Sequence, residues 1–175
     1  MARESVRVEG LEGVLNTLKN LPPELVSKNG GPVRTALRRG GVLILKEAQK
    51  NIQQIIDEPN KNGRDVSTGL AKKSLFLKRV RKMPNGQKGE AFIIAVKPNK
   101  YPNRMNRRKG RKARELQAND VLFMLENGTE NRPAMPWMRP AFEVKKQEAV
   151  EVFARELPRA IDRAVKKLSK QKGAR

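Results

Sequence analysis

Positive charge is concentrated in one stretch of this chain, from Lys72 to Arg114. That stretch holds sixteen Lys or Arg residues and one acid, Glu90, which gives it a net charge of +15. The whole chain of 175 residues carries +21, so the other 132 residues contribute only +6. A run of like charges this dense cannot be buried without partners, so it must form a surface. Its expected partner is a polyanion or an acidic protein surface.

Composition limits the fold and the chemistry. Hydrophobic residues make up 37% of the chain and aromatic residues 4%, so we expect one domain over residues 1–175 with a thin aliphatic core. The chain contains no cysteine and no histidine, which removes disulfides, thiolate metal sites and the usual general base. We therefore expect no enzyme activity, no cofactor and no metal. The chain has no apolar run long enough to predict a membrane span, so we expect no membrane partner.

The spacing of apolar residues predicts three amphipathic helices, over residues 11–21, 32–55 and 140–168. Pro158 is expected to kink or restart the last helix. The pair Gly40-Gly41 indicates either a structural role, which is close packing against another helix or a bend, or a glycine pair that the helix merely tolerates.

Alternating patterns predict strands near residues 6–8, 74–82 and 91–96, the last two joined as a hairpin. Residues 120–129 fit a buried strand or a short helix, which periodicity alone does not separate. The expected fold class is α+β, with a small antiparallel sheet of three to four strands packed against two or three helices and a long basic loop or arm.

Residues 97–118 form this basic arm. They lack an apolar period, so we expect an extended loop that is mobile in the free protein, and a flexible tail over residues 169–175. The alternatives for the arm are sequence-independent contact with DNA phosphates, contact with an acidic protein surface, or a solvated loop without a partner. The residues expected to make such contacts are Lys100, Arg104, Arg107, Arg108, Lys109, Arg111, Lys112 and Arg114.

The stretch LENGTENRPAMPWMRPAFE, residues 125–143, holds the only tryptophan of the chain. Gly128 permits a turn, Pro136 and Pro140 stiffen the loop, and Pro140 suits the first position of the last helix. Trp137 is either a plug in the core or an anchor for a neighbouring subunit, because interfaces are enriched in tryptophan.

This stretch resembles the signature of the tail-completion (head–tail joining) family, the minor tail or neck proteins of long-tailed, lambdoid-type bacteriophages. That signature is a hydrophobic-Glu-x-Gly-Thr turn followed by Pro-aromatic-hydrophobic-Arg-Pro-Ala. The matching residues are Glu126, Gly128, Thr129, Pro136, Trp137, Arg139, Pro140 and Ala141. The segment STGLAKKSL resembles the Thr-Gly element that opens the hairpin of the family, here Thr68, Gly69, Leu70 and Ser74. The basic arm is longer and more charged than the corresponding connection of the family, so the resemblance implies no role for it.

The resemblance implies a structural virion subunit in the phage neck, assembled in the host cytoplasm. The implied partners are further copies of the chain in a hexameric ring, the tail terminator or tail-tube protein, and the head connector protein. Sequence-independent contact with packaged DNA is a further expectation. Charge alone favours a different function, that of a sequence-independent nucleic-acid-binding protein of ribosomal or nucleoid type.

Overall fold

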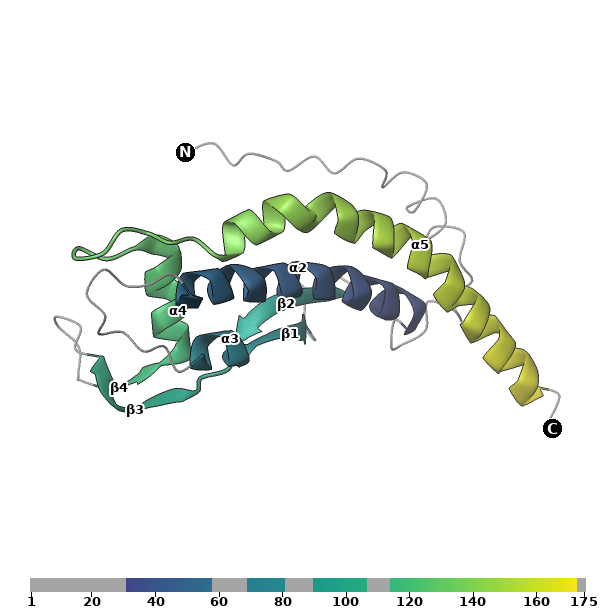
Figure 1. Cartoon of the computed structure of the whole chain (residues 1–175). Helices are drawn as coiled ribbons and strands as arrows, with labels where there is room; N and C mark the ends of the chain where they lie inside the picture. The colour runs from purple at the N-terminus through teal and green to yellow at the C-terminus, as the bar shows by residue number, and fades with distance from the viewer. Residues whose placement is uncertain (1–30, 58–68, 81–89, 107–113, 173–175) are drawn as a thin grey trace, which may run out of the picture. The chain divides into compact units, whose positions relative to one another are not determined.

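The computed structural model describes residues 31–57, 69–80, 90–106 and 114–172 (Figure 1). The described chain is α+β and mostly helical, as the sequence predicts. Its elements are α2 (Gly31–Asp57), α3 (Leu70–Ser74), β1 (Leu75–Val80), β2 (Ala91–Val96), β3 (Lys100–Asn106), β4 (Arg114–Gln117), α4 (Ala118–Asn127) and α5 (Met138–Lys172). The strand expected at residues 6–8 and the helix expected at 11–21 lie outside the described residues.

The strands form two antiparallel sheets of two strands each, β1 with β2 and β3 with β4. The prediction of one sheet with three to four strands is therefore wrong for the part of the chain that the structure describes. Pro102 in β3 has no N–H to offer a further strand, and proline is confined to sheet edges and bulges. The ladder of β3 and β4 is irregular between Lys100 and Met105, where this proline lies.

The basic arm is not an irregular loop over its whole length. Lys100 lies opposite Gln117, and Asn106 lies opposite Arg114, so both ends of the arm are paired strands. The prediction of an extended loop over residues 97–118 is wrong at these positions, and residues 107–113 lie outside the described ranges. Cross-strand pairing can stabilise a hairpin without an apolar face, and periodicity does not detect it.

Residues 120–129 are helical up to Asn127, which decides between the strand and the helix left open by the sequence. Helix α4 begins with a capping box, in which the backbone N–H of Gln117 donates to Asp120 Oδ2 at 3.1 Å. The helix ends at Gly128, whose φ of 75° is in the left-handed region that favours glycine.

The chain divides into two compact units, with α2, α5 and the β1–β2 hairpin each contributing to both. Unit 1 contains Met1–Ile44, Arg79–Ile93 and Lys145–Arg175, and unit 2 contains Leu45–Lys78 and Ile94–Val144.

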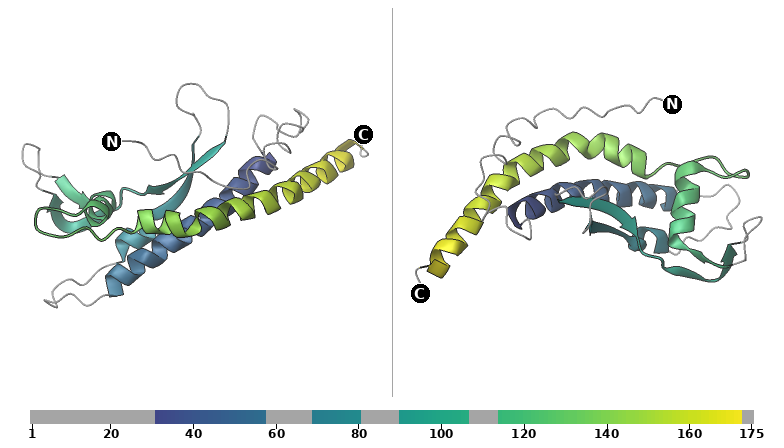
Figure 2. Two further views of the ribbon diagram at one scale, coloured as in Figure 1. Left: turned by 90° about the horizontal axis from the view of Figure 1, so that it is seen from above. Right: turned by 180° about the vertical axis from the view of Figure 1, so that it is seen from behind.

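The core of unit 1 is formed by α2 and α5, which run beside each other (Figures 1 and 2). Its buried residues are Ala36, Phe153 and Leu157. A Cβ at Gly40 would lie 2.7 Å from the backbone oxygen of Ala149, so the glycine permits close approach of the two helices. Of the two interpretations of the glycine pair, close packing therefore holds at Gly40. Helix α5 continues through Pro158 without a restart, and its ribbon curves in Figure 1.

The only acid of the basic stretch, Glu90, lies in unit 1 and is paired. Its carboxylate accepts hydrogen bonds from Arg79, with 2.7 Å between Nε and Oε2. The hydrogen bond to Glu90 raises the pKa of Arg79. This pair links the end of β1 to the residue that immediately precedes β2.

Candidate functional site

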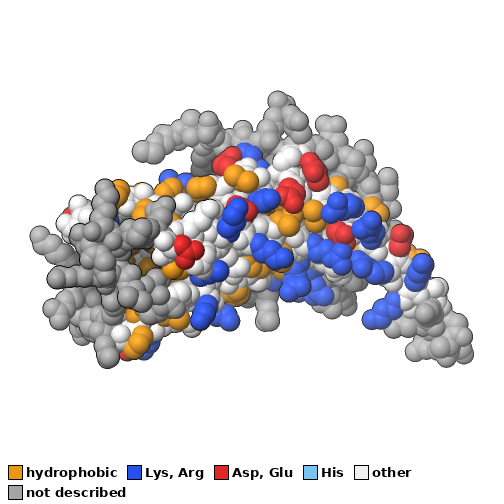
Figure 3. Space-filling model, in the orientation of Figure 1, with side chains coloured by type: hydrophobic (Ala, Val, Ile, Leu, Met, Phe, Trp, Pro, Cys, Tyr) orange, Lys and Arg blue, Asp and Glu red, His pale blue; other side chains and the backbone are white. Residues whose placement is uncertain are grey.

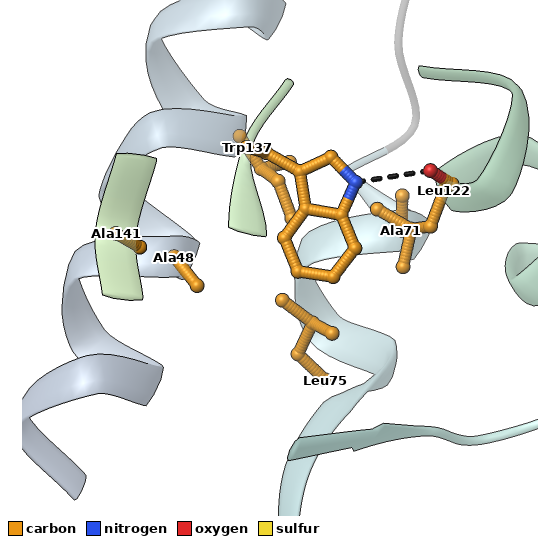
Figure 4. Packing of buried hydrophobic residues seen from close by; sticks show 7 residues of the cluster. Ala48, Ala71, Leu75, Leu122, Trp137 and Ala141 are labelled. Carbon is orange, nitrogen blue, oxygen red and sulfur yellow. Dashed lines mark hydrogen bonds between the residues drawn. The ribbon is translucent and has the colours of Figure 1, made fainter. Parts of the chain in front are cut away.

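Trp137 lies in the core of unit 2 with 7% of its surface exposed. It packs in a cluster to which α2, α3, β1, α4 and α5 all contribute (Figure 4). The other buried members are Ala48, Ile52, Ala71, Leu75, Leu122 and Ala141. Three of them are alanines on three different elements, α2, α3 and α5, and their small side chains leave room for the large indole ring. Of the two roles considered for Trp137, the structure places it as a core residue of its own chain.

Both polar groups of Trp137 are used within this core. The indole Nε1–H donates to the backbone oxygen of Leu122 in α4, at 2.9 Å. The backbone oxygen of Trp137 accepts a hydrogen bond from Asn51 Nδ2 in α2, at 3.0 Å. A buried indole N–H without an acceptor would cost stability, so these contacts fix the orientation of the ring as well as its depth. Trp137 thus ties α4 and α2 to the start of α5.

Glu126, in the last turn of α4, caps the beginning of α5. Its Oε2 accepts hydrogen bonds from the backbone N–H groups of Trp137 and Met138, both at 2.8 Å, and its Oε1 accepts from the N–H of Arg139 at 3.2 Å. The first N–H groups of a helix have no partner within it, and a negative charge there is also favoured by the helix dipole. One carboxylate, with 13% of its side chain exposed, therefore satisfies three donors at once.

Arg139 closes the junction from the outside. Its Nε donates to Glu126 Oε1 at 3.1 Å, and its Nη2 reaches the backbone oxygen of Glu126 and the side-chain oxygen of Asn127. The side chain is mostly exposed, so the ion pair itself contributes little to stability. Its planar guanidinium group nevertheless links the end of α4 to the first turn of α5 through several hydrogen bonds.

The loop between α4 and α5 folds back on α4. A Cβ at Gly128 would lie 2.9 Å from the backbone nitrogen of Ala134, so a side chain there would collide with backbone. Thr129 and Arg132 exchange backbone hydrogen bonds, at 2.9 and 3.2 Å. Pro140 is the third residue of α5, not the first as predicted. Proline is tolerated there because N–H groups of the first turn have no acceptor within the helix.

The second motif block meets the first in this core. Gly69, with φ of 66°, precedes α3. Ser74 at the end of α3 is fully buried, and its hydroxyl donates to the backbone oxygen of Leu70 at 2.6 Å and accepts from Asn99 Nδ2 at 2.9 Å. Ala71, between these positions, belongs to the Trp137 cluster. Thr68 lies outside the described residues. The two blocks that carry the family resemblance are thus joined through one set of packed side chains.

The basic arm is anchored to the same unit by carboxylates. Lys100 pairs with Glu115 across the β3–β4 ladder. Arg114 Nη2 lies 2.6 Å from Oδ1 of Asp120, which is 4% exposed. Lys100 and Arg114, both predicted arm residues, therefore have intramolecular partners. Arg104 lies in β3, and the predicted contacts from Arg107 to Lys112 lie outside the described residues.

Several residues that hold this site were not found from the sequence. Asn51 and Asn99 bond to partners that lie far away along the chain, and Asp120 in α4 pairs with Arg114 at the start of β4. The capping role of Glu126 was not found from the sequence either. In a capping box the acid lies within the first turn of the helix that it caps, whereas Glu126 lies in the preceding helix, α4. A local signal existed only at Asp120, which follows Gln117 by the capping-box spacing.

In the described part of the chain, no three acidic side chains gather into a group that could hold a metal ion. Within the same ranges, no helix has the length and apolar character needed to cross a membrane. Comparison of the chain with models of protein families, with curated proteins and with solved structures gave no match.

Proposed function

We propose that this chain is a structural, non-enzymatic subunit of the head–tail junction of a long-tailed bacteriophage. In this proposal it forms a ring, hexameric by the symmetry of such tails, that joins the tail terminator or tail-tube protein to the head connector protein. The subunit is assembled in the host cytoplasm and resides in the neck of the virion.

The observation that supports this proposal most is the structural role of the motif residues. Glu126, Gly128 and Trp137 hold the α4–α5 junction, and Ser74 anchors the segment next to it. All of them position backbone or fill the core, and none faces an open site with an unused polar group. A motif that builds a rigid junction is what a structural subunit requires.

Exposed apolar side chains support the assembly into a ring. In unit 2, Phe123 on α4 is 58% exposed, and Phe142 and Val144 on α5 are exposed as well. Exposed apolar side chains are suited to an interface, where contact with another subunit would remove them from water. Copies of the same chain are suitable partners, because a head-to-tail contact repeated around an axis closes into a ring.

A second candidate function is sequence-independent nucleic-acid binding of ribosomal or nucleoid type. The observation that favours it is the basic β3–β4 hairpin within a stretch of net charge +15. Such a protein would bind RNA or DNA through its phosphates and would not need tail or head proteins.

Deletion of the gene from the phage or prophage that carries it tests the proposed function. We expect negative-stain electron microscopy to show filled heads and complete tails that are not joined, and the wild-type gene supplied in trans to restore joined particles. Co-sedimentation distinguishes this function from the second candidate function. If the second candidate is correct, the protein sediments with ribosomes or nucleoids, and the deletion strain still makes joined particles. Joined, infectious particles without the protein would rule the junction function out.

A further inference from the structure

The pairing of α2 with α5 in unit 1 brings together basic side chains that are far apart in the sequence. Residues 31–44 of α2 contain three arginines and no acid, and residues 155–167 of α5 contain five basic residues and two acids. These two segments therefore carry a net charge of +6, outside the basic stretch between residues 72 and 114. On the face shown in Figure 3, Lys and Arg side chains gather over this helix pair.

The cations of α5 lie along one side of the helix. Arg155, Arg159, Arg163 and Lys166 are exposed and follow one another at intervals of four, four and three residues, so they share a face. The other side of the helix is occupied, because Phe153 and Leu157 are buried against Ala36 of α2. The apolar side of α5 is thus used by the fold, and its basic side remains at the surface.

Glu156 holds arginines from both helices in place. Its buried carboxylate pairs with Arg39 of α2 and with Arg159 of α5. The side chains of the two arginines remain 47% and 64% exposed, respectively. One carboxylate shared between two guanidinium groups leaves a net positive charge, already positioned before any partner arrives. Positioning in advance reduces the ordering cost of binding.

We infer that this α2–α5 surface is a preformed binding site for the phosphate backbone of duplex DNA, separate from the basic arm. Residues 155–167 extend over about 18 Å at about 1.5 Å per residue. Duplex DNA carries about one phosphate per 1.7 Å of its axis, so about ten phosphates lie along that length. Arginine predominates on the surface, and its planar group can contact phosphate oxygens in pairs.

The side chains of the α2–α5 surface also argue against sequence-specific contacts with DNA bases, and they favour DNA over a lipid membrane as the partner. The line of cations includes no aromatic or amide side chain, so binding does not depend on base sequence. An anionic membrane would be bound through an amphipathic helix that inserts its apolar face, and the large apolar residues Phe153 and Leu157 of α5 are buried against α2. The inference does not depend on the proposed role in a virion.

A salt titration of the full-length protein with two unrelated DNA duplexes of about 30 base pairs tests the inference. The variant replaces Arg155, Arg163, Lys166 and Lys167 with glutamine and leaves both ion pairs of Glu156 intact. We expect the slope of log K against log salt to fall in magnitude by about 3–4. The affinity at low salt should fall by about 100-fold or more, equally for both duplexes.

A matched control removes the same number of charges from the arm, by replacing Arg107, Arg108, Lys109 and Arg111 with glutamine. Because the two sites are separate, we expect the α5 substitutions to reduce the slope by the same amount in the wild type and in this arm variant. A loss confined to the arm variant would overturn the inference.

A second variant, with Arg155→Lys and Arg163→Lys, keeps the charge and should keep the slope, which separates loss of contact from damage to the fold. A wild-type slope in the four-glutamine variant would contradict the inference. So would a wild-type protein that binds phosphatidylserine vesicles but neither duplex.

Discussion

Glu126 and Trp137 show how single residues build the junction between α4 and α5. Glu126 accepts three backbone hydrogen bonds at the start of α5, and Trp137 fills the space between helices while donating to Leu122. Each residue satisfies donors or carbonyls that belong to another element. Substitution of either therefore loosens contacts on both sides of the loop that joins the two helices.

Replacing Trp137 with alanine is expected to lower the free energy of unfolding by about 3–5 kcal/mol, because it removes a buried indole and leaves a cavity. Trp137→Phe keeps most of the volume but loses the donor to Leu122, so we expect a smaller loss of about 1–3 kcal/mol. Urea denaturation followed by far-UV circular dichroism measures both variants. An alanine variant as stable as the wild type would show that the indole is not a core residue.

Replacing Glu126 with alanine should lower the free energy of unfolding by about 1–3 kcal/mol, through lost capping and lost interaction with the helix dipole. Glu126→Gln keeps an oxygen acceptor without the charge, so its loss should be smaller. Glu151→Ala, on the exposed part of α5, is the matched control and should change stability by less than about 0.5 kcal/mol. Equal melting temperatures for the Glu126 and Glu151 alanine variants would contradict the capping role.

At the scale of the elements, close approach and polar anchors place the helices and hairpins. Gly40 lets α2 approach the backbone of α5 at Ala149. Ser74 and Asn99 link α3 to the segment that enters β3, and Arg114 ties β4 to the buried Asp120. The hairpin of the basic arm is therefore held at its base by hydrogen bonds and ion pairs, and not by an apolar face.

Gly40→Ala is expected to destabilise the protein by about 1–3 kcal/mol, because the added methyl group meets the backbone of Ala149 and forces the helices apart. This sign is informative, since alanine favours an isolated helix by about 1 kcal/mol over glycine. Gly31→Ala is the control, because a Cβ there meets nothing within 4 Å. Thermal melting should show a decrease for Gly40→Ala and no decrease for Gly31→Ala; an increase at both would mean that the helices do not pack closely at this position.

At the scale of the whole molecule, the distribution of acids explains why so much positive charge stays on the surface. The chain has 18 acids against 39 basic residues. Within the ranges that the structure describes, five acids pair with a basic residue of another segment, namely Glu90, Glu115, Asp120, Glu126 and Glu156. Each of these acids is thus engaged by a basic residue of its own chain, while the chain as a whole keeps a net charge of +21.

Phe123→Ala tests the ring within the proposed function. Because Phe123 is exposed in the single chain, we expect its loss to change the free energy of unfolding by less than about 0.5 kcal/mol. A residue buried at the centre of an interface typically contributes about 2 kcal/mol or more, so the concentration needed for assembly should rise at least about tenfold. Sedimentation velocity measures the assembly, with Val165→Ala in unit 1 as the control. If assembly of the Phe123→Ala variant is unchanged, Phe123 is not part of the interface.

The sequence by itself determined much of the local structure of this protein and which side-chain chemistry is available to it. Apolar spacing predicted α2 and α5, and alternation predicted the strands β1 and β2. These features could be read because each depends on neighbours within a few residues, where helical and extended periods are directly visible. The absence of cysteine and histidine limited the available chemistry without any structure.

Only the tertiary structure decided which distant residues act together. Arg39 and Glu156 are separated by 117 positions, so no local pattern could place them in one basic surface. Glu126 caps a helix that begins beyond a loop, and Asn99 donates to Ser74, which lies 25 positions earlier in the chain. Trp137 was open to two roles in the sequence, and it became a core residue because α2, α3, β1 and α4 converge around it. Long-range packing and paired charges leave no period in a sequence, because their spacing is set by the fold and not by the chain.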